Sequence, residues 1–191
     1  GSGIGRSTSL SFAKCGASVL VSDVNVTGGE ETVSMIEAAG GSAKFVKCDV
    51  AKTDEVDALI KACVAEYGRL DFAHNNAGIS SPAANEWDED TWNLAVSINL
   101  TGVMHCMRAA ADAMLKNGGG AMVNTASIAG LVGNASQPAY VATKHAVMGL
   151  TKHGALKWAK DGIRVNAVCP GVIETAMTES VAKVPAYREA M

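Results

Sequence analysis

The sequence alternates short apolar runs with longer stretches of helical periodicity, and this alternation constrains the fold more than any other feature. Runs rich in β-branched and apolar residues occur at 18–22, 44–48, 70–74, 121–125 and 163–168. Helical stretches are predicted at 6–16, 27–39, 56–67, 91–116 and 140–160. Strands that alternate with helices at this spacing predict an α/β domain with an open parallel sheet and helices on both faces.

The ends of two of these helices carry capping patterns. Thr27 and Glu30 have the spacing of a capping box, which predicts that the second helix begins there. Gly68 follows the apolar face of the third helix and is placed as its C-terminal glycine.

Composition excludes several classes of protein. The 191 residues include 16 Lys and Arg against 19 Asp and Glu, a balance that does not favour binding to nucleic acid. The hydrophobic fraction of 48% supports a packed core over disorder. Because no apolar run approaches the ~18 residues of a membrane span and no signal peptide is visible, we expect a cytoplasmic protein that does not bind membranes.

The cysteines and histidines suggest neither a disulfide framework nor a metal site. An odd number of cysteines without a CxxC pair favours reduced, buried thiols, at Cys15, Cys48, Cys63, Cys106 and Cys169. No metal-ligand spacing relates the four histidines, which are His74, His105, His145 and His153.

A glycine-rich turn stands at the start of the chain, directly before the first predicted helix. Gly1, Gly3 and Gly5 would let the backbone approach a pyrophosphate, to which the helix N-terminus offers free N–H groups, although a simple capping turn also fits. Asp23 ends the next strand, 18 residues beyond Gly5, where its carboxylate can bind the adenosine ribose hydroxyls. That carboxylate would repel a 2′-phosphate, so the pattern favours NAD over NADP; a solvated turn residue is the alternative interpretation of Asp23.

Two further segments suggest proton-transfer chemistry. Tyr140 and Lys144 are four residues apart and therefore share one helix face, a spacing that also occurs on ordinary solvated helices. A nearby ammonium would favour the tyrosine phenolate. Ser127 directly follows a strand, where its hydroxyl could bind a substrate oxygen or could simply cap a turn.

Taken together, these segments resemble the short-chain dehydrogenase/reductase family over residues 1 to about 175. The opening Gly1-Ser2-Gly3-Ile4-Gly5 is similar to the last part of the family's TGxxxGxG cofactor turn. Ser127 precedes Tyr140 by the family's 13 positions, and Tyr140 to Lys144 is its YxxxK motif. Three other segments match: the NNAG segment Asn75-Asn76-Ala77-Gly78, the active-site asparagine as Asn99, and the PG segment Pro170-Gly171-Val172-Ile173-Glu174-Thr175.

The resemblance implies a Rossmann-like doubly wound fold and reversible hydride transfer between a nicotinamide cofactor and a secondary alcohol or its ketone. It implies that Tyr140 is the general acid/base and that Ser127 orients the reacting oxygen. Lys144 would lower the pKa of the tyrosine and hold the nicotinamide ribose, and Asn99 would hold a water in a proton relay.

The resemblance also assigns cofactor contacts. Asp49 and Val50 match the pair that contacts adenine, whereas Ile173 and Thr175 match residues that meet the carboxamide. The full set of implied cofactor-binding residues is Gly1, Gly3, Ile4, Gly5, Asp23, Asp49, Val50, Asn76, Ala77, Gly78, Tyr140, Lys144, Pro170, Gly171, Ile173 and Thr175.

Partners and the substrate lid are implied as well. Family members commonly form dimers or tetramers through the two long helices, here 91–116 and 140–160. Residues 176–191 fall where the family has a substrate lid; their apolar side chains suit an apolar cover, and internal packing explains them equally well.

Two parts of the family pattern do not occur in the sequence. The first strand would precede Gly1, and a last strand with its glycine-rich tail would follow Met191. In the family's strand order 3-2-1-4-5-6-7 the first strand is central, so we expect a gap between the second and fourth strands. We therefore expect residues 1–191 to be one nucleotide-binding domain truncated at both ends.

Three functions are compatible with these patterns. The leading one is an NAD-dependent dehydrogenase acting on a secondary alcohol. A 3-oxoacyl thioester (acyl carrier protein) reductase is disfavoured by Asp23, because that reaction usually draws on NADPH. A non-catalytic cofactor-binding scaffold is disfavoured because Tyr140 and Lys144 are both present.

Overall fold

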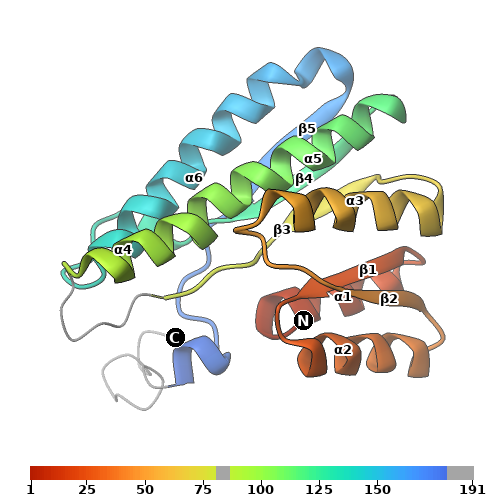
Figure 1. Ribbon diagram of the computed structural model, residues 1–191, viewed down its shortest axis with the longest axis horizontal. Coiled ribbons are helices and arrows are strands. Elements are labelled where there is room, and N and C mark those ends of the chain that lie inside the picture. The colour runs from red at the N-terminus through yellow and green to blue at the C-terminus, as the bar shows by residue number, and fades with distance from the viewer. Residues whose placement is uncertain (81–86, 180–191) are drawn as a thin grey trace.

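The computed structural model describes residues 1–80 and 87–179 of the chain. Its strands are β1 (Ser18–Asp23), β2 (Ser42–Lys47), β3 (Phe72–Asn75), β4 (Gly120–Thr125) and β5 (Ile163–Val168). Every hydrogen-bonded strand pair is parallel, and the five strands lie where the apolar runs predicted them (Figure 1).

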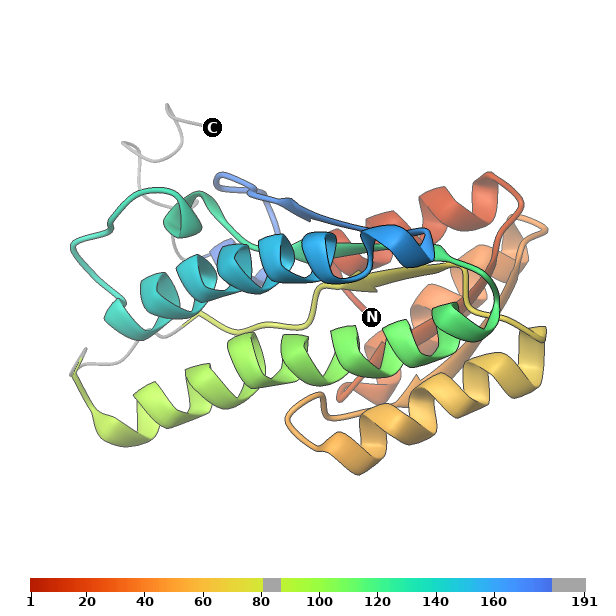
Figure 2. The same cartoon turned by 90° about the horizontal axis from the view of Figure 1, so that it is seen from above.

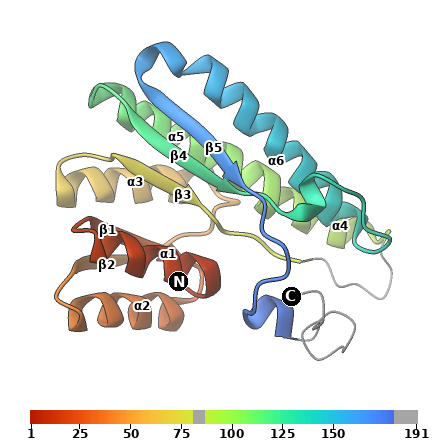
Figure 3. The same ribbon diagram turned by 180° about the vertical axis from the view of Figure 1, so that it is seen from behind.

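The strands form two sheets, with the orders β1-β2 and β3-β4-β5. Within residues 1–80 and 87–179, no strand pairs with both β1 and β3, and the two sheets lie side by side without a shared ladder (Figure 3). The second and fourth strands of the family pattern correspond to β1 and β3 here, so the predicted gap lies between these two strands. Truncation of the domain itself stays a prediction.

Helices lie on both faces of the β1-β2 sheet, whereas the described helices that pack on β4 and β5 lie on one face (Figure 2). Helices α1 (Gly3–Lys14) and α2 (Val26–Ala38) pack on one face, against β1 and β2. Helices α3 (Thr53–Tyr67), α5 (Gly102–Lys116) and α6 (Pro138–Lys157) lie on the other. The arrangement is a doubly wound, Rossmann-like α/β fold, as the sequence predicts.

The start of α2 differs from the prediction. Its N-cap is Asn25, whose Oδ1 accepts a hydrogen bond of 3.1 Å from the N–H of Gly28, so the capping box at Thr27 and Glu30 is wrong. The N–H of Asn25 is in turn bound by Asp23 Oδ1 at 2.9 Å, which turns the chain into the helix two residues earlier. Gly68 does end α3, with φ of 80°.

The long helix predicted at 91–116 is interrupted. It consists of α4 (Glu89–Val96), a π-helical turn at Ser97–Thr101, and α5. The π turn contains Asn99, whose buried side chain bonds to the backbone of Ile79 outside the helix. Similarly, α6 ends at Lys157 and is followed by a short 3₁₀ turn at Ala159–Asp161.

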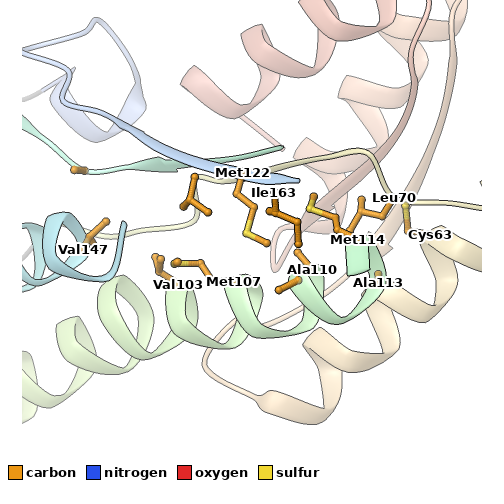
Figure 4. Close-up of a cluster of buried hydrophobic side chains, with 13 residues drawn as sticks. Cys63, Leu70, Val103, Met107, Ala110, Ala113, Met114, Met122, Val147 and Ile163 are labelled. Carbon is orange, nitrogen blue, oxygen red and sulfur yellow. The ribbon is translucent and has the colours of Figure 1, made fainter. Parts of the chain in front are cut away.

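The main core lies between α5, α6 and the β3-β4-β5 sheet (Figure 4). It is built from methionines and small or branched aliphatic residues, including Met107, Met114, Met122, Val147 and Ile163. A second cluster around Val21 and Ile36 joins α1 and α2 to the β1-β2 sheet. These clusters fix the strand ends at which the candidate site lies.

The thiols differ in exposure. All five cysteines are free; Cys48 and Cys63 are buried as expected, and Cys106 and Cys169 are partly buried. Cys15 is exposed, contrary to the expectation of a buried thiol, because it lies just past the end of α1. In the part of the chain that the structure describes, no helix has the length and apolar character needed to cross a membrane.

Candidate active site

The residues singled out from the sequence gather at the carboxyl ends of the strands. Asp23 ends β1, residues 49–50 follow β2, residues 76–78 follow β3, Ser127 follows β4 and Pro170 follows β5. Open parallel sheets bind ligands at this edge.

The glycine turn lies against the end of β1. The backbone nitrogen of Gly1 is 2.8 Å from Asp23 Oδ2. A Cβ atom on Gly1 would come within 2.9 Å of the Gly29 nitrogen and 3.0 Å of Asp23 Oδ2, and Gly3 has a φ of +51°. Both positions therefore need glycine, and the turn forms a close backbone cradle at the N-terminus of α1.

Asp23 is half-buried in this cradle. Burial disfavours its charged form, but the hydrogen bond from the N–H of Asn25 and the hydrogen bond and charge of the Gly1 N-terminal ammonium outweigh this effect and lower the pKa of the carboxyl group. The Asp23 carboxyl group at the end of β1 is therefore ionised, and it pairs with the Gly1 ammonium.

Arg6, which the sequence analysis did not single out, braces the turn. Its guanidinium donates to Thr32 Oγ1 at 2.9 Å and to the carbonyl oxygens of Gly1 and Gly28 at 3.3 Å, and it pairs with Glu31. The only sequence feature that pointed to it was its place directly after the glycine turn.

A cavity of about 410 Å³ separates the start of α1 from the PG segment. The Cγ2 atom of Thr175 lies 3.1 Å from the place where a Cβ on Gly3 would stand, so these distant segments meet here. Two of the lining residues, Ser7 and Thr8, were not expected, and Glu174 belongs to the PG segment but had no assigned contact; the others are Gly3, Ile4, Pro170, Ile173 and Thr175.

Asn76 lies beside the third glycine of the turn. A Cβ on Gly5 would be 3.0 Å from Asn76 Nδ2. The Oδ1 atom of Asn76 accepts a hydrogen bond of 3.0 Å from the hydroxyl of Thr125. Ala77 follows, between Asn76 and Gly78, and leads the chain towards α6.

The loop after β2 is fixed by its own hydrogen bonds. Asp49 Oδ1 accepts from the N–H of Ala51 at 3.0 Å, and the N–H of Asp49 donates to Glu55 Oε2 at 2.8 Å. The carbonyl oxygen of Val50 is 3.0 Å from His105 Nδ1. None of these bonds reaches the glycine turn or α6, but the N–H of the preceding Cys48 donates to the Asp23 carbonyl oxygen at 3.2 Å, so the loop begins beside the end of β1.

Tyr140 and Lys144 lie on one face of α6. The Lys144 Nζ atom is 5.4 Å from the centre of the Tyr140 ring and donates a hydrogen bond of 2.8 Å to the carbonyl oxygen of Thr125. Only 4% of Lys144 is exposed. Burial lowers the pKa of its ammonium to about 8, against an opposing influence of Cys169. Among the described residues, no ion pair includes Lys144.

Asn99 and Gly78 complete this centre. Asn99 Oδ1 accepts from the N–H of Ile79 at 2.8 Å, and its Nδ2 donates to the Ile79 carbonyl oxygen at 2.9 Å. A Cβ on Gly78 would lie 3.2 Å from Asn99 Oδ1 and 3.6 Å from Lys144 Nζ. The NNAG segment, the π turn and the YxxxK motif therefore converge.

Ser127 caps the 3₁₀ turn Ile128–Gly130 by accepting a hydrogen bond of 3.1 Å from the N–H of Ala129. The turn presses on α6, since a Cβ on Gly130 would be 2.7 Å from the Lys144 carbonyl oxygen. Among the described residues, Ser127 and Tyr140 share no hydrogen bond. The capping role considered from the sequence is therefore observed, on the segment that flanks the Tyr140–Lys144 pair.

The predicted lid at 176–191 is only partly described. Residues 176–179 include a 3₁₀ turn, Ala176–Thr178, which Thr175 and Thr178 close through reciprocal hydrogen bonds. Residues 180–191 lie outside the described part of the chain.

A glycine cradle at a helix N-terminus, an acidic strand end and a tyrosine beside a buried lysine, on a doubly wound parallel sheet, define a class of nucleotide-binding oxidoreductases. The family model for short chain dehydrogenases matches residues 1–185. The chain belongs to this family, as the resemblance of its motifs predicted.

The names of related proteins describe enzymes that act on varied alcohols and ketones. A cyclohexanol dehydrogenase of Acinetobacter sp. (strain SE19) is 44% identical over 93% of this chain and 71% of that protein. A 3beta-hydroxysteroid dehydrogenase of Mediterraneibacter gnavus is 43% identical over 93% of the chain and 65% of that protein. A 3-oxoacyl-[acyl-carrier-protein] reductase of Synechocystis sp. is 40% identical over 94% of the chain and 73% of that protein.

The fold also matches solved structures. A single-residue variant of actinorhodin polyketide ketoreductase, solved with NADPH, superposes with a TM-score of 0.91 and 37% identity, over 98% of this chain and 76% of that one.

Proposed function

We propose that this protein transfers a hydride between NAD(H) and an uncharged secondary alcohol or its ketone. The observation that carries the proposal is Tyr140 on the same helix face as Lys144, a buried ammonium held 5.4 Å from the tyrosine ring. This pair lies at the same sheet edge as the glycine cradle and Asp23.

In the oxidation direction Tyr140 removes the hydroxyl proton of the alcohol, and in the reduction direction it returns one. The Oγ of Ser127 accepts from Ala129, which leaves its O–H proton to donate to the reacting oxygen. The nicotinamide ring, when bound, supplies or accepts the hydride.

The lysine is suited to exchange protons as well as to hold a charge. Its pKa of about 8 lies close enough to neutral pH for the group to exist in both protonation states. Asn99 bonds to Ile79 through both polar groups of its side chain and also donates to Thr143 Oγ1 at 3.5 Å, so its part in positioning this centre is to hold the segment that follows β3 next to α6. A water relay that ends at Lys144 stays a prediction.

The choice of NAD rests on Asp23. Each carboxylate oxygen accepts one hydrogen bond inside the cradle, from Asn25 and from Gly1, and retains a lone pair for a ribose hydroxyl. Its negative charge opposes a 2′-phosphate. Two cations lie near it: the N-terminal ammonium of Gly1 pairs with Asp23 itself, and the guanidinium of Arg6 is engaged by Glu31.

The residues beside Ser127 support an uncharged, apolar substrate. Positions 128–139, between the serine and the tyrosine, contain no charged residue. Ile128, Leu131 and Val132 are 51%, 58% and 54% exposed on this segment. Such a surface favours an alicyclic alcohol, which is the kind of substrate that the names of two relatives give.

The test is a set of initial rates measured by the absorbance of reduced nicotinamide. Cyclohexanol, a 3β-hydroxysteroid and, in reverse, a 3-oxoacyl thioester are each offered with NAD(H) and NADP(H). We expect turnover of an alcohol with a clear preference for NAD. Preferential reduction of the thioester with NADPH would establish the reductase alternative, and cofactor binding without turnover of any of these compounds would favour the scaffold.

Assembly and location stay predictions. We propose a homodimer or homotetramer that forms through α4–α5 and α6, which sedimentation of the purified protein would test. A cytoplasmic location is likewise proposed, and cell fractionation would test it.

A further inference from the structure

A chain of hydrogen bonds runs from His74 to the glycine turn. His74 Nε2 is 2.8 Å from Thr125 Oγ1, which donates to Asn76 Oδ1 at 3.0 Å. The parallel register places these groups together, because Asn75 pairs with Asn124, so Thr125 comes between His74 and Asn76 on one face of the strands. No motif pointed to His74 or Thr125.

The direction of these bonds follows from the number of protons available. The Thr125 hydroxyl has one proton, which it donates to Asn76, so its oxygen must accept from His74. Burial lowers the pKa of His74 and favours the neutral ring. A neutral ring that donates from Nε2 carries its proton there, which fixes the tautomer.

The hydrogen bonds from His74 through Thr125 in turn set the orientation of the Asn76 side-chain amide. With Oδ1 held by Thr125, the amide nitrogen is directed to the glycine turn, where it lies 3.0 Å from the Cβ position of Gly5. If the amide flipped, its NH₂ group would meet the Thr125 hydroxyl and its oxygen would face the turn. The tautomer of His74 with its proton on Nε2 and this orientation of the Asn76 amide therefore go together.

We propose that His74 is a positioning residue for the dinucleotide: through Thr125 it holds the Asn76 amide with its N–H group towards the glycine turn. The proposal rests on the proposed function only in requiring that a nicotinamide dinucleotide binds at this turn. Thr125 also accepts the Lys144 hydrogen bond, but through its main-chain carbonyl, which side-chain substitutions leave in place.

Four variants separate positioning from packing. His74→Phe and Thr125→Val remove the donor and the hydroxyl but keep the approximate size of the side chain. His74→Gln restores a donor near the place of Nε2, and Thr125→Ser restores the hydroxyl. The dissociation constants of NADH and NADPH are measured by calorimetric titration, together with kcat, KM and the melting temperature.

We expect His74→Phe and Thr125→Val to weaken dinucleotide binding about threefold to tenfold, the usual effect of losing one hydrogen bond. We expect kcat within about twofold of the wild type, and near-normal binding in His74→Gln and Thr125→Ser. The double variant His74→Phe/Thr125→Val should bind no more weakly than Thr125→Val alone, because one pathway is lost in both.

Binding by His74→Phe within twofold of the wild type would overturn the proposal, as would equal losses in His74→Phe and His74→Gln. A lower melting temperature with unchanged binding would show that His74 serves only packing. If the wild type binds NADPH in place of NADH, the choice of NAD in the proposed function fails, and the variants are compared with NADPH. If it binds neither dinucleotide, both proposals fail.

Discussion

Asn99 holds both the N–H and the carbonyl oxygen of Ile79, at 2.8 Å and 2.9 Å. The side chain is fully buried, so each of these bonds replaces contacts with water that the groups would otherwise make. One residue of the π turn therefore fixes the chain just beyond the NNAG segment.

Asn99→Asp should destabilise the protein and reduce its activity. Aspartate can accept from the Ile79 N–H, but its other oxygen faces the Ile79 carbonyl and leaves that group without a donor. We expect a loss of about 1–3 kcal/mol in the free energy of unfolding, measured in urea. Asn93→Asp, on the exposed face of α4, is the matched control. Equal stabilities of the two variants would contradict the stabilising role of the two Asn99–Ile79 hydrogen bonds.

Tyr140→Phe should abolish most turnover and leave dinucleotide binding unchanged. Removal of a general acid/base lowers rates by about 10² to 10⁴. Steady-state kinetics measures the turnover, and calorimetric titration measures the dinucleotide binding. Tyr67→Phe removes a hydroxyl that donates to Val19 at the other end of the fold, and it should retain activity. A wild-type rate in Tyr140→Phe would refute the assignment.

Lys144→Met should be inactive, and its stability relative to wild type should depend on pH. Below pH 8 both folded and unfolded wild type carry the proton, so the burial of the charge destabilises the fold in full. Between about 8 and the ordinary 10.5 the folded lysine loses its proton first, and this destabilisation fades.

The free energy of unfolding of Lys144→Met, taken relative to that of the wild type, should therefore fall by about 3 kcal/mol across that range of pH. The unpaired Thr125 carbonyl lowers the stability of the variant equally at every pH and cancels from this change. Urea titrations at pH 7, 9 and 10.5 measure it, with Lys152→Met on the exposed side of α6 as the control. A constant difference would show that the lysine is not buried as described.

Asp23→Asn should relax the choice between dinucleotides. The substitution removes the negative charge that opposes a 2′-phosphate but keeps a similar shape. We expect the ratio of kcat/KM for NAD to that for NADP to fall at least about fivefold, since one close charge repulsion is of the order of 1 kcal/mol or more. Asp90→Asn, exposed on α4, should leave the ratio unchanged; an unchanged ratio in Asp23→Asn would remove the basis for NAD.

Thiol labelling should follow exposure. Cys15 is exposed, whereas burial raises the pKa of Cys48 to about 11 and that of Cys106 to about 12. Iodoacetamide reacts with the thiolate, so native protein near pH 8 should be alkylated first at Cys15. Peptide mass spectrometry checks the order, and labelling in urea should remove the difference. Rapid labelling of Cys106 in the native state would contradict its burial.

The strands and the residues at their ends were predictable because both depend on local patterns. β-branched runs place the five strands, and Asp23 and Ser127 then fall at the sheet edge without any knowledge of contacts. The part that depends on distant contacts was not predictable. Arg6 acts through oxygens about 25 residues away on α2, and His74 acts through Thr125 on the next strand.

A local pattern also failed where a neighbouring residue acts first. Thr27 and Glu30 have good capping spacing, but the Asp23 carboxylate binds the Asn25 N–H and starts the helix at Val26. Similarly, apolar periodicity continues through 91–116 because the π turn disturbs the pattern by only one residue.

That single extra residue sets the angular relation of the two halves of the long helix. An α-helix turns by about 100° per residue, so deleting one position from Ser97–Thr101 would rotate α4 by roughly that amount about the axis of α5. The shortened helix would be regular, but its asparagine would no longer face Ile79. The π turn therefore sets the rotation of α4 relative to α5, so that one long helix packs on the core and also places Asn99 at the candidate active site.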